Sequence, residues 1–440
     1  NNIYDLAYMF SYKPKTTTPA QVNIDLYQQI PSKTVGGQIV PDFDYALTIN
    51  SGATISNNSV SFLTQDKVDF SFSSSMDPTE ITVYQTLGDV PQYYLLKKQV
   101  PAISGQLKSK EFTVGTTPTS FLTLKVNDEN IIKVTSVKDS YQTFNEVDYL
   151  GQEMIFKKIK NNNINNPNSL DLNDDVPYFL QLFKTSARFT SRLKSEGELE
   201  IQFGSGNFND VDEMIIPNPN NVGLGLPFKQ DKLTSAYSPT NFLYTGTYGI
   251  SPLGKVTVSY LVGGGISSNV EANTLTTINK KIATFNEGFL NPSTSNYVFS
   301  SISCNNPEAA TGGQNGDTIE EIKQNTLAQV ASQKRTVTAD DYLIRALSMP
   351  SDLGSVYKAL IQKPNLTSQV SSINSLNLYI LSLNQLGKLT LSNSILKNNL
   401  RTYLSQYRMI GDSIEIKDAY IINIGIEFEI IVLPDFNNNA

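Results

Sequence analysis

The chain has 440 residues, of which 39% are hydrophobic and 17% charged, and its formal net charge is −7 at pH 7. An acidic chain offers no basic stripe for a phosphate backbone, so we expect no nucleic-acid partner. The sequence has no His and one Cys, Cys304, which excludes His-dependent catalytic triads, internal disulfides and cysteine-based zinc clusters.

The length predicts roughly two to four structural units, because a single compact core rarely grows to this size. No stretch approaches the roughly 18 consecutive apolar residues of a spanning helix, so we expect no membrane insertion. The sequence begins with Asn and shows no charged-then-apolar leader, so we expect a piece of a longer chain that carries no visible signal peptide.

The first two thirds of the chain have the pattern of antiparallel β-structure. After a short helical stretch, residues 21–30 alternate apolar and polar side chains between Pro19 and Pro31, which predicts a half-buried strand. Gly, Pro, Asn or Ser separate the further short runs, which are residues 45–56, 59–73, 79–87, 111–116, 120–126, 178–193, 198–208, 215–227 and 254–265. Residues 157–177 are Asn-rich without apolar periodicity, and we expect an exposed loop there.

Helical signals dominate from residue 316. Thr318 with Glu321, or Asp317 with Glu320, makes a capping box, and Thr338 is a good N-cap for a second helix. Strands are predicted at residues 355–362 and 376–383, followed by a helix that Ser392 caps and a strand at 420–433. The apolar stripe of this last helix consists of Leu396, Leu400, Tyr403, Leu404 and Tyr407.

These patterns predict an α+β chain that is mainly β, with antiparallel β-domains followed by a helical elbow and a small α+β domain. We expect the end of a helical region at residues 1–14 and β-rich domains at 15–300, with an inserted subdomain at about 100–195. A helix–elbow–helix core is expected at 301–350, and a β-β-α-β domain at 351–440.

Four segments resemble known chemical sites, and each has a plainer interpretation. Residues 171–175, DLNDD, begin like a calcium loop but lack its sixth-position Gly and twelfth-position carboxylate. Asp210, Asp212 and Glu213 cluster like acid–base carboxylates, but such a pair must face each other across a substrate. The glycines of residues 262–268 and 203–207 are more simply explained by turns. We therefore expect no catalytic residue, no metal and no cofactor.

The segment KRTVTADDY, residues 334–342, joins the two predicted helices. Asp340 and Asp341 fall in the first turn of the second helix, where carboxylates suit the helix dipole. Arg335 lies outside that helix, and we expect it to brace the elbow by bidentate pairing with a carboxylate. The plainer interpretation is a solvated charged face.

This elbow resembles the hallmark of the baseplate J-like family of contractile-tail phages. The family pattern is a Gly-Gly and acidic lead-in, a helix, and an R-x-V-T-x-x-D-Y elbow, which Arg335, Val337, Thr338, Asp341 and Tyr342 match without a gap. The turn at Phe203, Gly204 and Gly206 is similar to the family's F-G-x-G turn, with Ser205 where an acidic residue is common. The strand at residues 254–265 and the entry at 12–26 follow in the family's order.

The resemblance is strongest to the larger T-even-type members, and it implies a non-enzymatic structural role. Copies pair within a baseplate wedge and, with other wedge proteins, form a ring around the tail hub that rearranges on contraction. The implied location is the virion tail, assembled in the bacterial cytoplasm, and no cofactor is implied. From the residues alone, a secreted or tail-associated glycan- or cell-surface-binding β-protein stays open, as does an enzyme using clustered Asp, although Trp is absent.

Overall fold

The computed structural model describes most of the chain, and strand residues outnumber helical ones, so the predicted mainly β, α+β class is confirmed. The described residues are 2–10, 12–15, 17–57, 59–74, 77–160, 178–195, 197–206, 215–217, 242–244, 248–279, 282–285, 290–332, 335–362, 375–409 and 411–427.

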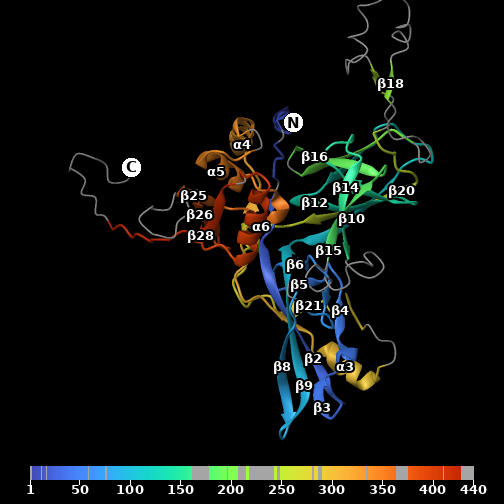
Figure 1. The fold of residues 1–440 in the computed structure, drawn as a ribbon. Coiled ribbons are helices and arrows are strands. Elements are labelled where there is room, and N and C mark those ends of the chain that lie inside the picture. Colours follow the sequence, from blue (N-terminus) through green and yellow to red (C-terminus); the bar gives the residue numbers. More distant parts are fainter. Residues whose placement is uncertain are drawn as a thin grey trace, which may run out of the picture.

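An eight-stranded sheet carries the first core. Its long strands β2 (Gln21–Val35) and β9 (Val90–Ser104) pair antiparallel, and the predicted strand at 21–30 is confirmed within β2. The other strands are β3 (Gln38–Pro41), β5 (Thr54–Ser56), β6 (Ser61–Thr64), β8 (Glu80–Leu87), β21 (Thr277–Ile278) and β23 (Ser303–Asn305). Figure 1 shows β2, β3, β8 and β9 projecting away from the rest of the chain.

Smaller elements cover this sheet and complete its core. They are the three-stranded sheet of β22 (Ala283–Phe285), β4 (Leu47–Ile49) and β7 (Val68–Asp69), the helix α3 (Pro292–Ser300) and the short helix η1 (Phe43–Tyr45). The core beneath them contains Ile24, Leu26 and Phe62, all fully buried, because every second side chain of β2 points to the same face.

A seven-stranded sheet forms the second core around Phe203 and Ile201. Its strands, in spatial order, are β10 (Gln106–Thr113), β20 (Lys255–Val262), β12 (Ile131–Lys138), β13 (Thr143–Glu146), β16 (Arg188–Ser195), β17 (Glu198–Phe203) and β11 (Thr123–Asn127). β20 lies between β10 and β12, so the sheet extends to residue 262, beyond the end near 195 that we expected for an inserted subdomain. Two hairpins stand apart from it, β14 (Met154–Lys160) with β15 (Tyr178–Lys184) and β18 (Ile215–Pro217) with β19 (Phe242–Tyr244).

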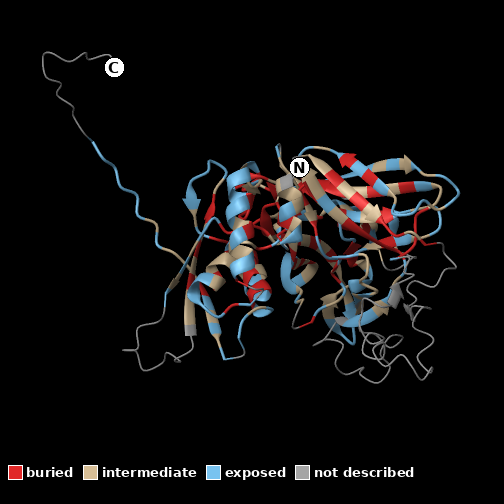
Figure 2. Cartoon of the chain, turned by 90° about the horizontal axis from the view of Figure 1, so that it is seen from above, coloured by how far each residue is buried: buried red, intermediate tan, exposed pale blue. Residues whose placement is uncertain are grey.

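The third core belongs to the C-terminal α+β unit. β26 (Ser375–Leu383) pairs antiparallel with β25 (Lys358–Gln362) and β27 (Leu389–Thr390), and parallel with β28 (Ser413–Asp418). The crossover helix α6 (Ser394–Ser405) packs its predicted stripe of Leu and Tyr side chains on this sheet. Figure 2 shows buried residues following the sheets and the inner faces of the helices.

Two predictions in this unit need correction. Asn393, not Ser392, caps α6, because its side chain accepts a hydrogen bond from the amide of Leu396. The predicted strand at 420–433 is wrong for residues 420–427, which join no sheet; the strand of this unit lies earlier, at β28, and residues 428–433 lie outside the described part.

The remaining elements connect the three cores. They are α1 (Asn2–Met9), β1 (Thr17–Thr18), η6 (Ile266–Ser268), β24 (Gln314–Asn315), α4 (Ile319–Ala331), α5 (Ala339–Leu347) and η8 (Ser351–Leu353). α1 packs on α4 through Ala7, Tyr12 and Ile322. None of the helices in the described ranges has the length and apolar character needed to cross a membrane.

Candidate functional site

The two helices of the elbow each begin in a complete capping box. At α4 the amide of Glu321 donates to Thr318 Oγ1 at 3.3 Å, and the amide of Thr318 donates to Glu321 Oε2 at 2.8 Å. At α5 the same reciprocal pair joins Thr338 and Asp341, at 3.2 and 2.8 Å. Both predicted caps are confirmed, so two otherwise unsatisfied backbone donors are bonded at the start of α4 and two more at the start of α5.

The residues of the elbow differ in their exposure and in their hydrogen bonds. Asp341 Oδ2 also accepts the amide of Val337 at 3.1 Å, and these backbone hydrogen bonds lower the pKa of Asp341. Val337 and Asp340 are exposed, and Lys334 lies outside the described residues. Arg335 is exposed, and its charge contributes to lowering the pKa of Asp341. It forms no hydrogen bond or ion pair with Asp340 or Asp341, all three of which are described, so the predicted bidentate pairing with these carboxylates is not found.

Tyr342 fastens α5 to the C-terminal unit. Its ring is 1% exposed, and its hydroxyl donates to Asp412 Oδ2 at 2.6 Å; burial and this carboxylate raise the pKa of the phenol. Thr336 makes a second link, because its amide and its hydroxyl both donate to the carbonyl of Tyr407. The elbow is therefore held by two contacts against the segment between α6 and β28.

Arg345 provides the buried brace that sequence reasoning assigned to Arg335. Its side chain is 1% exposed, its Nη2 donates to Ser332 Oγ at 3.0 Å, and its guanidinium carbon lies 4.7 Å from the centre of the Tyr407 ring. No carboxylate among the described residues pairs with it, so the aromatic face and the hydroxyl carry the contact. The sequence contains one indication of this role, because Arg345 follows Tyr342 by three residues and so lies on the same face of the helix.

The glycines before the elbow allow two backbone segments to meet. A Cβ on Gly313 would fall 2.5 Å from the carbonyl oxygen of Gly265, and the Asn269 side chain bonds to both the amide and the carbonyl of Gly313. Gly263, Gly264 and Gly265 all have positive φ, which confirms that residues 262–268 form a turn. The lead-in thus serves close backbone approach, which only Gly permits here.

The acidic residue of the lead-in ties down the N-terminal segment. Asp317 Oδ2 accepts the hydroxyl of Tyr12 at 2.6 Å and the amide of Lys15 at 3.0 Å. Burial together with this carboxylate raises the pKa of Tyr12. The start of α4 is consequently joined to a segment more than 300 residues earlier in the chain.

A buried polar junction links the first sheet to the C-terminal unit. Gln21 and Thr311 exchange backbone hydrogen bonds, and the Asn393 side chain donates to the carbonyl of Gln21 at 2.6 Å. The Gln21 amide group also donates to the carbonyl of Asp352 at 2.8 Å. Gln21 Oε1 is buried without a hydrogen-bond partner, so the network is not fully satisfied. Its other buried hydrogen bonds favour one arrangement of the parts they connect, because a displacement would leave further polar groups unpaired.

The family turn lies in a different core from the elbow. Phe203 is fully buried in the seven-stranded sheet, and a Cβ on Gly204 would fall 2.0 Å from the carbonyl oxygen of Gly249. The amide of Gly206 donates to the same carbonyl at 3.0 Å. The segments at Gly204 and Gly249 therefore cross each other closely. The turn predicted at residues 203–207 extends into residues outside the described part. No hydrogen bond or ion pair between described residues joins it directly to the elbow.

The other predicted candidates fall outside the described residues, namely 171–175 and the cluster of Asp210, Asp212 and Glu213. Within the described ranges, no three His, Cys, Asp or Glu side chains are grouped so that they could hold a metal ion.

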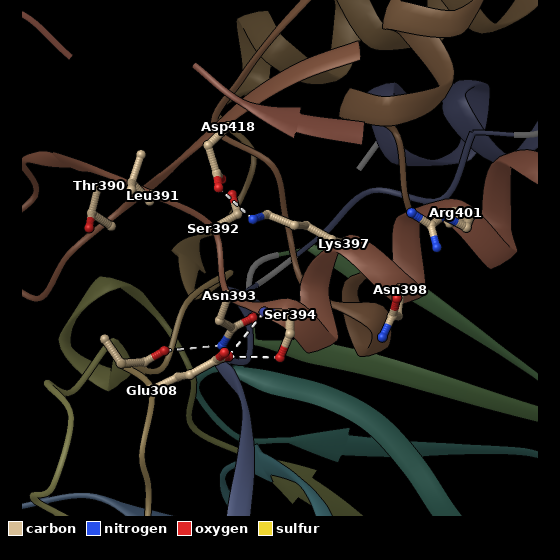
Figure 3. A pocket seen from close by; sticks show the side chains of 11 residues that line it. Glu308, Thr390, Leu391, Ser392, Asn393, Ser394, Lys397, Asn398, Arg401 and Asp418 are labelled. Carbon is tan, nitrogen blue, oxygen red and sulfur yellow. Dashed lines mark hydrogen bonds and ion pairs between the residues drawn. The ribbon is translucent and has the colours of Figure 1, made fainter. Parts of the chain in front are cut away.

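A shallow groove of about 550 Å³ opens beside α6. In Figure 3, Lys397 reaches Asp418 and Glu308 reaches Ser394; these contacts measure 2.5 and 2.7 Å. Leu391, also on the lining, is 52% exposed. The first contact is an ion pair, whereas Glu308 bonds to a neutral hydroxyl.

No protein-family model and no curated protein sequence matches this chain. Among solved structures, the chain is similar to one titled "Cryo-EM structure of the anti-feeding prophage (AFP) baseplate, 6-fold symmetrised", with 9% identity and a TM-score of 0.21. The similarity covers 94% of this chain and 60% of that chain, so this chain spans less than two thirds of the neighbour's length. A TM-score this low does not establish a shared fold.

Proposed function

We propose that this chain is a structural component of a contractile-tail baseplate wedge and has no catalytic role of its own. In this proposal, it pairs with a second copy and with other wedge proteins, and the resulting ring surrounds the tail hub and rearranges on contraction. The proposal places it in the tail of a virion or of a related contractile particle.

The observation that carries the proposal is what the hallmark residues bind. Thr338 and Asp341 cap a helix, Tyr342 bonds to Asp412, and Gly313 allows two backbone segments to touch. All of these contacts are internal, and those of Tyr342 and Gly313 join elements that are distant in the sequence. Residues that join the cores stiffly are expected in a protein that transmits force. They are less expected in a protein whose role is to bind a ligand in a cleft.

Exposed apolar side chains around the elbow support an assembly role. Leu327 and Val330, on neighbouring turns of α4, are 72% and 47% exposed, and Val337 in the elbow is 53% exposed. Apolar side chains grouped on a surface are typical of contacts with other proteins. The rigid interior behind them means that a rearrangement would exchange surface contacts and leave the body intact.

The test is to delete the gene for this chain from the organism that encodes it and to image released particles by negative-stain electron microscopy. We expect contractile tails without baseplates, or no tails, and recovery when the intact gene is supplied. Normal tails with complete baseplates in the deletion strain would overturn the proposal.

One observation favours the second candidate, a glycan- or cell-surface-binding protein. Phe121 and Tyr248 are 42% and 38% exposed, and their ring centres are 6.3 Å apart. Both have positive φ, which is unusual for bulky residues and is often retained at functional positions. If these rings form a sugar platform, calorimetry with bacterial surface polysaccharides will show binding that Phe121→Ala abolishes; absence of heat with the unaltered chain would dismiss this candidate.

A further inference from the structure

The segment after β28 exposes apolar side chains that the rest of the described chain does not cover. Tyr420, Ile422, Ile424 and Ile426 are 72–90% exposed. Figures 1 and 2 show residues 419–427 leaving the body beside β28 as an extended, exposed stretch, which we term the C-terminal arm. Its alternation is that of a strand with one buried face, yet it joins no sheet of the described residues.

β28 has an edge that such a strand can join. Among the described residues, β28 pairs only with β26, so the backbone groups on its other side are available for a further strand. Ile414 and Ile416 point from β28 into the third core, and Asp418 bonds to Lys397 of α6. The even-numbered residues of β28 therefore face α6. Four large apolar residues of the arm, Tyr420, Ile422, Ile424 and Ile426, are also even-numbered, and Ile421 is the large apolar residue on the opposite face.

We propose that two copies of this chain exchange their C-terminal arms, each arm adding antiparallel to β28 of the other copy. Antiparallel residues that face each other lie on the same side of a sheet. A two-fold axis at Tyr420 then places Ile414 opposite Ile426 of the second copy and Ile416 opposite Ile424 of the second copy. This register continues the apolar face of both sheets, and the same contact occurs twice because the pairing is isologous.

The second copy is favoured as occupant because, in this register, its even-numbered apolar side chains continue the apolar face of the free edge and none of its charges lies opposite a like charge. On the outer face, Lys417 lies opposite Asn423 of the second copy and Glu415 lies opposite Gly425 of the second copy, so no two like charges are directly opposed. A register shifted by one residue would place Ile424 on the polar face, which costs the burial of that side chain. The groove beside α6 adjoins the root of the arm at Asp418, where Ile422 of the second copy would be placed.

This inference rests on the pairing in the proposed function and names the segment responsible. The first measurement is the solution mass of the 440-residue chain by light scattering over a concentration series, combined with amide hydrogen exchange. We expect a concentration-dependent dimer, with amides of residues 420–427 protected when the dimer is populated. A monomer at every concentration, or a dimer whose arm amides exchange freely, would overturn the inference.

Substitutions in the arm test the face and the register. Ile424→Asp should weaken the dimer on the order of 100-fold or more, because two carboxylates would be buried per dimer. Asn423→Glu places a carboxylate opposite Lys417 of the second copy and should tighten the dimer about 2–30-fold, whereas Asn423→Lys should weaken it by a similar factor. Both sites are exposed in the single copy, so the fold of the variants should be preserved.

The outcomes separate the two proposals. If Ile424→Asp leaves the dimer intact, or if both Asn423 variants have equal affinity, the arm exchange is wrong. The wedge proposal would then still be decided by the particles released from the deletion strain. If the exchange is confirmed but the deletion strain makes complete baseplates, the wedge proposal is wrong and only the dimer proposal is supported.

Discussion

The hydroxyl of Tyr342 donates a 2.6 Å hydrogen bond to Asp412, which lies 70 residues further along the chain. Tyr342 belongs to the first turn of α5, and Asp412 lies just before β28, so the bond joins the elbow to the strand that precedes the C-terminal arm. The elbow and the C-terminal unit share one core through this contact.

Tyr342→Phe removes this bond and leaves the ring in place. We expect a loss of about 1–2 kcal/mol in the free energy of unfolding of this unit, because the buried hydroxyl donates to a carboxylate. Denaturant unfolding and hydrogen exchange of the α5 amides measure it. Tyr357→Phe is the matched control, since Tyr357 is 43% exposed; equal effects of the two variants would contradict a role for the Asp412 bond.

The two arginines near the elbow should differ sharply. Arg345→Ala removes a buried side chain and its contact with the Tyr407 ring, and we expect a loss of about 2–4 kcal/mol. Arg335→Ala removes an exposed side chain without an ion pair to Asp340 or Asp341, and we expect a change within about 0.5 kcal/mol. Urea unfolding of both variants is the measurement, and the reverse order would restore Arg335 as the brace.

The capping carboxylate predicts a pH dependence. The hydrogen bonds from the Thr338 and Val337 amides hold the pKa of Asp341 below its ordinary value of 3.8 in the folded chain. Its stabilising contribution is therefore complete above that value and is lost as the pH falls through the lower folded-state pKa. The difference in unfolding free energy between the unaltered chain and Asp341→Asn should shrink over this range.

Asp340→Asn is the control for removal of a carboxylate from this helix turn. Asp340 lies in the same first turn of α5 and is exposed, but Thr338 forms its capping box with Asp341. At neutral pH we expect Asp340→Asn to lower the unfolding free energy less than Asp341→Asn, because it leaves the capping box intact. A difference for Asp341→Asn that grows with acidity would contradict the capping assignment.

The close approach at Gly313 predicts a steric cost. Gly313→Ala places a methyl group 2.5 Å from the Gly265 carbonyl oxygen, and we expect a loss of about 1–3 kcal/mol as the two segments separate. Gly115→Ala is the matched control, because the nearest atoms to its added carbon are 3.9 Å away. Thermal unfolding of the two variants compares them, and equal midpoints would show that the junction adapts without cost.

Local patterns in the sequence were sufficient for the class of fold and for the elements whose signals are short in range. The strand at residues 21–30, the two Thr caps and the apolar stripe of α6 follow from alternation, from a hydroxyl three residues before a carboxylate, and from a 3.6-residue period. Each depends on neighbours within about four residues, so a single sequence contains the information.

Tertiary contacts decided which polar residues bear the structural roles. Arg335 and Arg345 are both cations near the elbow, and only the packing of α6 against α5 places a Tyr ring beside Arg345. Asp412 carries no local signal for its bond to Tyr342, because its partner lies 70 residues away. Burial strengthens a polar contact and raises the cost of losing it. Which side chains become buried depends on how the whole chain folds.

The C-terminal segment illustrates both what the sequence determined and what the tertiary structure determined. The sequence by itself predicted a strand at residues 420–433, because apolar and polar side chains alternate from Ile422 to Glu427 and such a pattern is typical of a strand with one covered face. Only the tertiary structure decided that β28 occupies the edge of the C-terminal sheet and that the alternating segment extends beyond it, because strand pairing depends on which edges are already bonded. The alternation in the sequence indicates that one face of this segment must be covered, and the folded chain shows that no described residue covers it.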